Sequence, residues 1–232
     1  MKQLIEVLAG NRYPGRGVLW CRTMDGSALG GYFLTGRSPA SQARGLHPTP
    51  AGELVVAPSD VREHDHLRHY VAARRAGDWV VYGNGEQVAT VADRLVAGQP
   101  PQLALDGLDY EPDPPLFTPR LTVVADSREA DCAWFGAARH SAGGRVAADR
   151  LTLRVGRLAP GEGVLVTTYR SDGHEVSTGA PFTEVGTAAE GRAELLAELW
   201  SALPSELRIA AAVFAPDDPA GAEIRQAAGP SA

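Results

Sequence analysis

The sequence has few of the residues that build disulfide frameworks, zinc clusters or nucleic-acid surfaces. Its two cysteines, Cys21 and Cys132, have no CxxC spacing, which excludes a disulfide scaffold and a cysteine-based structural zinc site. We expect both to be buried free thiols. Lys2 is the only lysine, and the formal net charge is -6. A nucleic-acid-binding protein would present a basic face, so we expect no nucleic-acid partner.

Long hydrophobic runs are also missing. No eighteen consecutive residues are apolar, and residues 1–6 lack the basic-then-apolar order of a signal peptide. We therefore expect a cytoplasmic protein with no membrane partner. A chain of 232 residues that is 44% hydrophobic can fill the core of one large domain. We expect that domain over residues 1–215, followed by a frayed tail over residues 216–232.

The common cofactor and metal motifs are absent as well. We find no Walker-type glycine loop, no GxGxxG after a strand, no GxSxG elbow and no HExxH. The nearest approach to a metal site is the group His64, His66 and His69. Three histidines this close can chelate zinc, but a catalytic zinc site usually also draws ligands from distant segments. We interpret them as a solvated polar segment and predict no metal site.

Arginine is abundant where lysine is not. Of the 22 basic residues, 22 - 1 = 21 are arginines, and many stand beside glycine or proline in the first half of the chain. A planar guanidinium grips a phosphate in two places, whereas a lysine acts as a point charge. A small anionic substrate therefore stays open.

Hydrophobic periodicity predicts many strands and few helices. Amphipathic patterns predict helices over residues 2–9, 88–97 and 190–203. Apolar runs between turn residues predict strands over residues 18–22, 29–35, 53–57, 79–82, 121–125, 133–138, 151–155, 164–169 and 208–214. Strands grouped between inserted helices indicate the α+β class.

Three segments have weaker patterns. Residues 44–52 carry Gly, Pro and Thr without periodicity, so we predict an exposed loop there. The proline-rich residues 110–119 are predicted to form an ordered loop. Residues 60–76 stay ambiguous, because their polar residues permit a helix while residues 67–73 also fit a strand.

Four loops are dense in Gly, Pro, Arg, Asn and Tyr. They read NRYPGRG at residues 11–17, TGRS at 35–38, YGNGEQ at 82–87 and YEPDPPLFTPR at 110–120. In this order they resemble the NPYPGRG, GRS, NGDQ and FEPD…TPR motifs of the stand-alone, archaeal-type IMP cyclohydrolase family. Residues 168–173 resemble that family's TYxxDG stretch. The chain departs from the family at Glu86, where aspartate is usual, at residues 42–44, where Arg-Asn-Arg is expected, and in a longer C-terminal region.

The resemblance covers residues 1 to about 185 and implies a fold, a reaction and a partner. The fold would be a four-layer αββα sandwich of the N-terminal-nucleophile hydrolase type, without a metal or an organic cofactor. The reaction would close 5-formamidoimidazole-4-carboxamide ribotide to IMP with loss of water, so the partner would be a small-molecule purine nucleotide. A homo-oligomer stays open.

Ring closure joins two groups of one molecule, since the carboxamide nitrogen attacks the formyl carbon and the carbinolamine then loses water. The enzyme must hold a productive rotamer, take a proton from a poor nucleophile, stabilise an oxyanion and help hydroxide leave. None of these steps needs a covalent nucleophile, and no processed Cys, Ser or Thr stands near Tyr13. We therefore favour ring closure by positioning over an amidohydrolase mechanism.

The resemblance also implies site residues. For the ring-closing centre we predict Tyr13, Asn84, Arg120 and Tyr169 as catalytic residues. For substrate binding we predict Arg16, Arg37, Ser38, Arg44, Gly85, Gln87 and Thr118, with Arg37 and Ser38 as the strongest phosphate-binding pair.

Structural alternatives stay open for these residues. The arginines could face solvent, and Asn84 could belong to an ordinary turn. Arg120 could form an ion pair with Asp113 or Glu111, and the tyrosines could simply pack. Two other functions also stay open: a related cyclohydrolase acting on another azole carboxamide ribotide in secondary metabolism, and a non-catalytic purine-nucleotide-binding protein.

Overall fold

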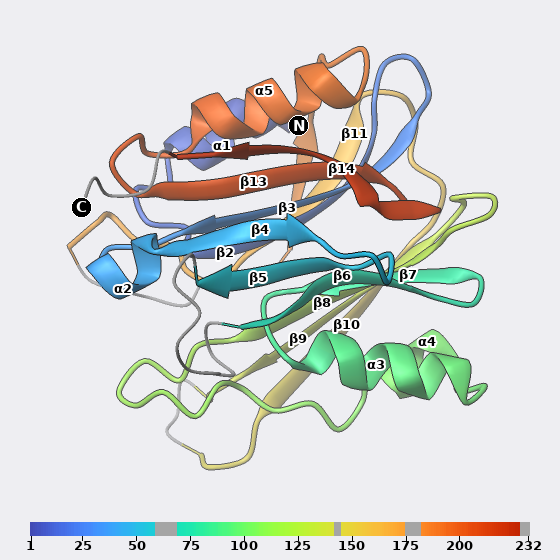
Figure 1. Cartoon of the computed structure of the whole chain (residues 1–232), viewed down its shortest axis with the longest axis horizontal. Helices are drawn as coiled ribbons and strands as arrows, with labels where there is room; N and C mark the ends of the chain where they lie inside the picture. The colour runs from blue at the N-terminus through green and yellow to red at the C-terminus, as the bar shows by residue number, and fades with distance from the viewer. Residues whose placement is uncertain (59–68, 142–144, 175–181, 228–232) are drawn as a thin grey trace.

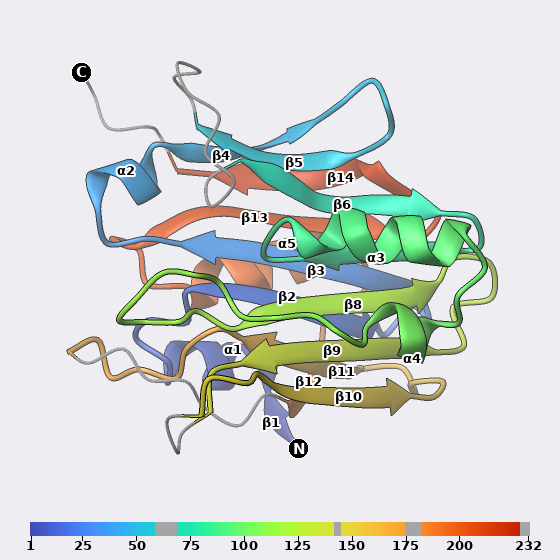
Figure 2. The same ribbon diagram turned by 90° about the horizontal axis from the view of Figure 1, so that it is seen from below.

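The computed structural model describes residues 1–58, 69–141, 145–174 and 182–227. These residues form two sheets and five helices (Figures 1 and 2). The first sheet has the order β1 (Lys2–Gln3), β12 (Thr183–Gly186), β11 (Glu162–Thr167), β2 (Arg16–Arg22), β3 (Ala28–Thr35), β13 (Arg208–Ala215) and β14 (Asp218–Gln226). The second has the order β10 (Asp149–Val155), β9 (Ala133–Arg139), β8 (Arg120–Asp126), β7 (Trp79–Gly83), β6 (Tyr70–Ala76), β5 (Leu54–Pro58) and β4 (Arg44–Pro48).

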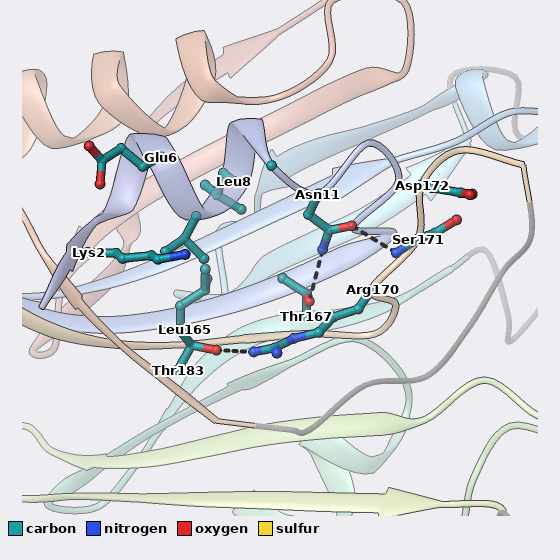
Figure 3. A pocket seen from close by; sticks show the side chains of 12 residues that line it. Lys2, Glu6, Leu8, Asn11, Leu165, Thr167, Arg170, Ser171, Asp172 and Thr183 are labelled. Carbon is teal, nitrogen blue, oxygen red and sulfur yellow. Dashed lines mark hydrogen bonds between the residues drawn. The ribbon is translucent and has the colours of Figure 1, made fainter.

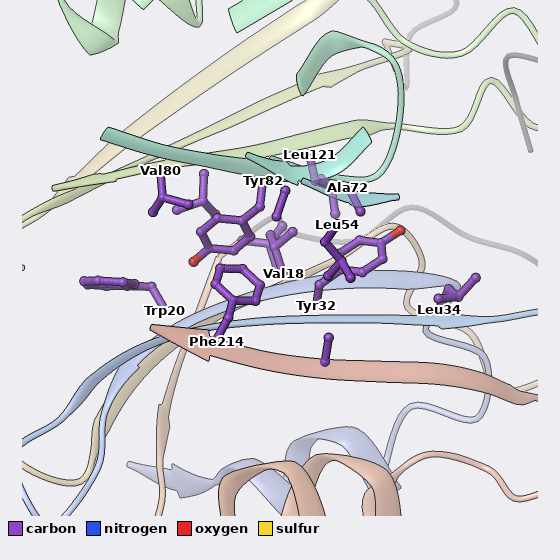
Figure 4. Close-up of a cluster of buried hydrophobic side chains, with 14 of the residues drawn as sticks. Val18, Trp20, Tyr32, Leu34, Leu54, Ala72, Val80, Tyr82, Leu121 and Phe214 are labelled. Carbon is purple, nitrogen blue, oxygen red and sulfur yellow. The ribbon is translucent and has the colours of Figure 1, made fainter. Parts of the chain in front are cut away.

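The two sheets share one hydrophobic cluster (Figure 4). Because successive side chains of a strand point to opposite faces, Val18 and Trp20 of β2 belong to this cluster. Across it, the ring of Tyr82 from β7 meets Phe214 from β13 edge-on, with ring centres 5.2 Å apart. The Tyr82 hydroxyl donates a 2.7 Å hydrogen bond to the backbone carbonyl of Leu19. The second sheet is thus tied to the first by packing and by a buried hydrogen bond.

Helices cover the other face of each sheet (Figure 1). Leu8 of α1 (Leu4–Ala9) and Leu199 of α5 (Arg192–Ala202) pack in one cluster with Leu19 of β2. On the second sheet, α3 (Gln87–Val96) and α4 (Pro101–Ala104) pack in a cluster that includes Val81 and Val124. Both faces of the central strands are therefore buried, which explains why residues 18–21 are apolar without alternation.

The predicted helices at both ends and after residue 86 are confirmed, as is the hairpin of β2 and β3. The ambiguous segment ends in a strand, β6, while residues 59–68, with His64 and His66, lie outside the described residues. None of the helices in the described part of the chain is long and apolar enough to cross a membrane.

The loop predicted over residues 44–52 is wrong in its first half, where β4 forms an edge strand paired with β5. A distant side chain supplies hydrogen bonds that the edge strand lacks. The amide of Gln226 accepts from the backbone N–H of Leu46 at 3.0 Å and donates to its carbonyl at 3.1 Å. Residues 44–48 are therefore held extended by a hairpin with β5 and by the distant side chain of Gln226, neither of which local composition indicates.

The frayed tail predicted from residue 216 is also wrong over residues 218–226. These residues form β14, which pairs antiparallel with β13. Ala222 and Ile224, separated by one residue, pack against the cluster between the sheets. The Asp, Pro and Gly content of this segment led to the prediction of a frayed tail, but its alternating apolar side chains pack on the core.

Candidate active site

A small polar pocket opens where several motif loops meet. Its volume is about 200 Å³, and it is lined by Tyr13, Gly15, Arg16, Thr35, Ser41, Arg44, Glu111, Asp113, Leu116, Thr118 and Tyr169. Five of these were predicted from the sequence: Tyr13, Arg16, Arg44, Thr118 and Tyr169. They come from the start of β2, the start of β4, the loop before β8 and the end of β11. The tertiary fold therefore joins segments that are up to 156 residues apart.

Gly15 allows the chain to enter β2 against the pocket wall. Its φ is +70°, which favours glycine, and an added Cβ would lie 2.2 Å from Oγ1 of Thr168 and 2.6 Å from Cδ2 of Tyr169. The hydroxyl of Thr168 accepts from the backbone N–H of Arg16 at 3.0 Å. This close approach holds Tyr169 beside the first residues of β2.

Arg16 and Glu111 form a buried ion pair in the wall. The two guanidinium nitrogens of Arg16 donate to the two carboxylate oxygens of Glu111 at 2.8 and 3.0 Å, and one of them also donates to the carbonyl of Asn84 at 3.0 Å. Burial disfavours the charged guanidinium, but the Glu111 carboxylate outweighs it, and the pKa of Arg16 lies well above its usual value. Arg16 therefore carries a fixed positive charge.

Glu111 is a site residue that the sequence prediction missed. We considered it only as an ion-pair partner of Arg120. The signal that could have found it is the YEPD motif itself, in which an acidic residue follows the aromatic one. We predicted that the guanidinium group of Arg16 binds phosphate, but in the structure it binds this carboxylate. The structure thus gives Arg16 a carboxylate partner within the protein.

Tyr169 faces the pocket from the end of β11. Its ring stacks on that of Tyr13, with centres 5.5 Å apart and planes inclined by 16°. Its hydroxyl lies 2.5 Å from Oγ1 of Thr118. Burial raises the pKa of Tyr169 above its usual value, so the phenol is neutral at physiological pH. Two tyrosines predicted separately therefore act as one stacked pair.

Asn84, Gly85 and Gln87 lie outside the pocket lining. Asn84 is fully buried, its amide nitrogen donates to the carbonyl of Pro119 at 2.8 Å, and its amide oxygen accepts from the N–H of Leu121 at 2.6 Å. Gln87 donates to the same amide oxygen at 3.1 Å. The catalytic role predicted for Asn84 gains no support from this geometry. Its side chain joins the segments before α3 and β8, and its carbonyl holds Arg16.

Arg120 and Ser38 are also outside the lining of the small pocket. Arg120 pairs with Glu86 at 2.7 Å, whereas we had considered Asp113 or Glu111 as its ionic partner. Ser38 is exposed and caps α2 (Pro39–Gln42) by accepting from the N–H of Ser41 at 3.2 Å. Neither side chain joins the residues that line this pocket.

Arg37 connects the pocket to a second cavity. Its guanidinium lies over the ring of Tyr13, 4.4 Å from the ring centre. The same residue lines a cavity of about 680 Å³, together with Arg12 and His174. Among the described residues, neither Arg12 nor Arg37 has a carboxylate within ion-pair distance. The same cavity is also lined by Asp172 and Glu206, so the two arginines lie in a wall of mixed charge on the outer side of Tyr13.

A third cavity, of about 440 Å³, lies between α1 and the edge strands of the first sheet (Figure 3). It is larger than the small pocket, but it contains none of the predicted site residues. Its wall includes Asn11, whose side chain donates to the carbonyl of Tyr169 at 2.8 Å and accepts from the N–H of Ser171 at 3.1 Å. We place the active site in the small pocket, because charged and hydroxyl side chains of several motif loops converge there.

No group of three or more His, Cys, Asp or Glu residues able to hold a metal occurs within the described parts of the chain. Of the histidine group considered from the sequence, only His69 belongs to those parts.

Comparison with known proteins agrees with the motifs. The profile of the IMP cyclohydrolase-like protein family matches residues 13–220. The IMP cyclohydrolase of Methanopyrus kandleri is 30% identical over 161 residues, covering 68% of this chain and 75% of that protein. The IMP cyclohydrolase of Methanothrix thermoacetophila is 31% identical over 198 residues, covering 81% and 86%. That of Halobacterium salinarum is 32% identical over 156 residues, covering 65% and 71%. The chain therefore belongs to the IMP cyclohydrolase-like family.

Proposed function

We propose that this chain is an IMP cyclohydrolase, which closes 5-formamidoimidazole-4-carboxamide ribotide to IMP with loss of water. The observation that carries the proposal is the convergence of three motif loops, residues 11–17, 110–120 and 168–169, on one polar pocket. The family profile and the named relatives support the same activity.

We also propose that the fold is the four-layer αββα sandwich of the N-terminal-nucleophile hydrolase type. Support comes from two sheets that share a central cluster, with helices packed on the other face of each. Arg16 is the first residue of β2 and follows Tyr13 and Gly15 in the sequence. The loop before it, residues 11–15, contains no Cys, Ser or Thr. The reaction therefore relies on positioning and proton transfer rather than on a covalent nucleophile.

Arg44 is suited to the developing oxyanion. It lines the pocket, and its Nε donates to the carbonyl of Ser41 at 3.0 Å, which fixes the plane of the guanidinium. Its terminal nitrogens have no partner among the described residues, so they can bind the oxygen of the attacked formyl group. A cation placed beforehand at this position stabilises the oxyanion more in the transition state than in the substrate.

The ribose phosphate extends out of the small pocket. A volume of about 200 Å³ is less than the ~300–1,000 Å³ typical of small-molecule sites. The pocket also contains the carboxylates of Glu111 and Asp113, which would repel a phosphate. Beyond Tyr13, Arg37 and Arg12 line a cavity that also contains Asp172 and Glu206. Neither arginine has a carboxylate within ion-pair distance among the described residues, whereas Arg16 is already paired with Glu111. We therefore place the base in the pocket and the phosphate on the Arg37 side of Tyr13.

Arg37→Ala tests this placement. Because the phosphate contact acts alike on substrate and transition state, KM should rise by roughly tenfold or more while kcat changes little. The matched control is Arg154→Ala in β10, which removes an exposed guanidinium lying over Trp134 of β9. Steady-state kinetics in which Arg37→Ala lowers kcat and leaves KM unchanged would place the phosphate elsewhere.

The activity itself is tested by incubating the purified protein with the formyl ribotide and following IMP formation by ultraviolet absorbance. We expect turnover, and we expect it to persist in EDTA. Activity that EDTA abolishes and zinc or magnesium restores would contradict a metal-free mechanism. Tight IMP binding without turnover would instead indicate a nucleotide-binding protein, and turnover of a different azole carboxamide ribotide alone would change the substrate.

A further inference from the structure

Three oxygen atoms form a continuous hydrogen-bonded chain at the pocket wall. The hydroxyl of Tyr169 lies 2.5 Å from Oγ1 of Thr118, and that oxygen lies 2.5 Å from Oδ2 of Asp113. The other carboxylate oxygen of Asp113 accepts from the backbone N–H of Thr118 at 2.7 Å. Thr118 itself is 1% exposed. The chain joins Tyr169 to the half-buried carboxylate of Asp113, and both groups also line the pocket.

The chemistry of the end groups sets the direction of every hydrogen bond in this chain. An ionised carboxylate can only accept, so the hydroxyl hydrogen of Thr118 must point to Asp113. The Thr118 oxygen can then only accept from Tyr169. The phenolic hydrogen of Tyr169 therefore points to Thr118, and its lone pairs remain available to accept a proton from a ligand in the pocket.

We propose that Tyr169, Thr118 and Asp113 form a proton relay that takes the carboxamide proton during ring closure, with Asp113 as the terminal acceptor. This inference rests on the proposed function, because it needs the carboxamide nitrogen beside Tyr169. It assigns Asp113 and Thr118 roles that neither the motifs nor the pocket geometry by itself supplies.

The proton transfers balance. As the carboxamide nitrogen bonds to the formyl carbon, its proton passes to Tyr169, the phenolic proton passes to Thr118, and the threonine proton passes to Asp113. The formyl oxygen becomes an oxyanion, so one negative charge moves from Asp113 to the carbinolamine. The proton returns by the same path to that oxygen. Hydroxide then leaves as the formamido nitrogen releases its proton, and the two form water.

The surroundings explain why a relay is needed. Burial raises the pKa of Tyr169, which disfavours a free phenolate, so Tyr169 alone is a poor base. Both carboxylate oxygens of Glu111 are bound by Arg16, so that carboxylate cannot take a proton without weakening a buried ion pair. Asp113 has no ion-pair partner within the described residues. A concerted relay avoids an isolated charge on Tyr169.

Thr118→Val and Thr118→Ser are the first test. Valine keeps the shape of threonine and removes the hydroxyl, so kcat should fall on the order of 10²-fold, the range of a positioned acid or base, with KM nearly constant. Serine restores the hydroxyl and should restore most of kcat. The affinity for IMP, measured by titration, checks that each variant keeps its pocket.

Asp113→Asn is the second test. The amide oxygen of asparagine can still accept from the N–H of Thr118, while its NH₂ group donates to the threonine hydroxyl and reverses the chain. We expect a similar loss of kcat. The matched control is Asp109→Asn, at an exposed carboxylate in the same loop that accepts the N–H of Tyr110 at 2.8 Å. That variant should leave kcat unchanged.

The double variant separates a relay from two independent effects. If Thr118 and Asp113 act in series, Thr118→Val with Asp113→Asn should be no slower than Thr118→Val alone. A product of the two single losses, or wild-type kcat in Thr118→Val, would overturn the relay while leaving the cyclohydrolase activity intact. An inactive wild-type protein would instead contradict the proposed function.

Discussion

Glu111→Ala is expected to lower the free energy of unfolding by about 3–5 kcal/mol, because it leaves the charge of Arg16 buried without a partner. The side chains of Arg16 and Glu111 are only 10% and 6% exposed. Loss of the carboxylate removes two hydrogen bonds from the Arg16 guanidinium. Urea denaturation monitored by tryptophan fluorescence would measure this decrease in the free energy of unfolding. The part of the pocket wall that the ion pair forms should be disrupted in the same variant.

The matched control is Asp78→Ala, which breaks the pair between Asp78 and Arg128. These side chains are 51% and 70% exposed, so the loss should be at most about 1 kcal/mol. Replacing both members of the buried pair, in Arg16→Met with Glu111→Leu, should recover part of the stability because no unpaired charge remains. Equal effects of Glu111→Ala and Asp78→Ala would show that the buried pair contributes no more than a surface pair.

Gly15→Ala is expected to destabilise the protein by several kcal/mol and to abolish most of its activity. A residue with a side chain in this left-handed conformation costs about 1–3 kcal/mol. Forcing an extra carbon into a packed site costs about another 1–3 kcal/mol. The added Cβ would meet Thr168 and the ring of Tyr169, so Tyr169 must move away from Tyr13. Thermal unfolding and steady-state kinetics would record the two effects.

Gly26→Ala measures the cost of the left-handed backbone conformation without a steric clash. Gly26 has a φ of +88°, but no atom lies within 4 Å of an added Cβ. Its cost should be about 1–2 kcal/mol, the strain of a left-handed residue alone, with unchanged kcat. If Gly15→Ala and Gly26→Ala gave the same results in both measurements, the close approach of Tyr169 to β2 would make no contribution to stability or activity.

Where local signals decide the conformation, prediction from the sequence was accurate. The hairpin of β2 and β3 closes through Asp25, whose carboxylate accepts from the N–H and hydroxyl of Ser27 and from the hydroxyl of Thr23. These contacts span two residues along the chain. The amphipathic spacing of α3 likewise placed Val88, Val91 and Leu95 on its buried face, although the fourth apolar position, Val96 at the end of the helix, is 69% exposed.

Where long-range pairing decides, prediction was wrong or incomplete. Residues 44–48 and 218–226 pair with the neighbouring strands β5 and β13. What their composition does not indicate is the distant contacts that cover them: Gln226 bonds the backbone of Leu46, and Ala222 and Ile224 pack on the central cluster. The partner of Arg16 is Glu111, 95 residues away, while Arg120 pairs with Glu86. Spacing in the sequence offers no way to choose among several carboxylates and several arginines, because the choice depends on which loops the two sheets bring together.

The sequence by itself determined the family, the strand-rich class and the loops that carry the chemistry, since glycine, proline and aromatic motifs act locally and keep their order along the chain. Only the tertiary structure decided which motif residues face the pocket. It set Tyr13, Arg44, Thr118 and Tyr169 around one cavity, and it placed Asn84, Gln87 and Arg120 behind or beside it. The physical reason is that hydrogen bonds require atoms within about 3 Å, and at the pocket that proximity is produced by strand pairing and by the packing of one sheet on the other.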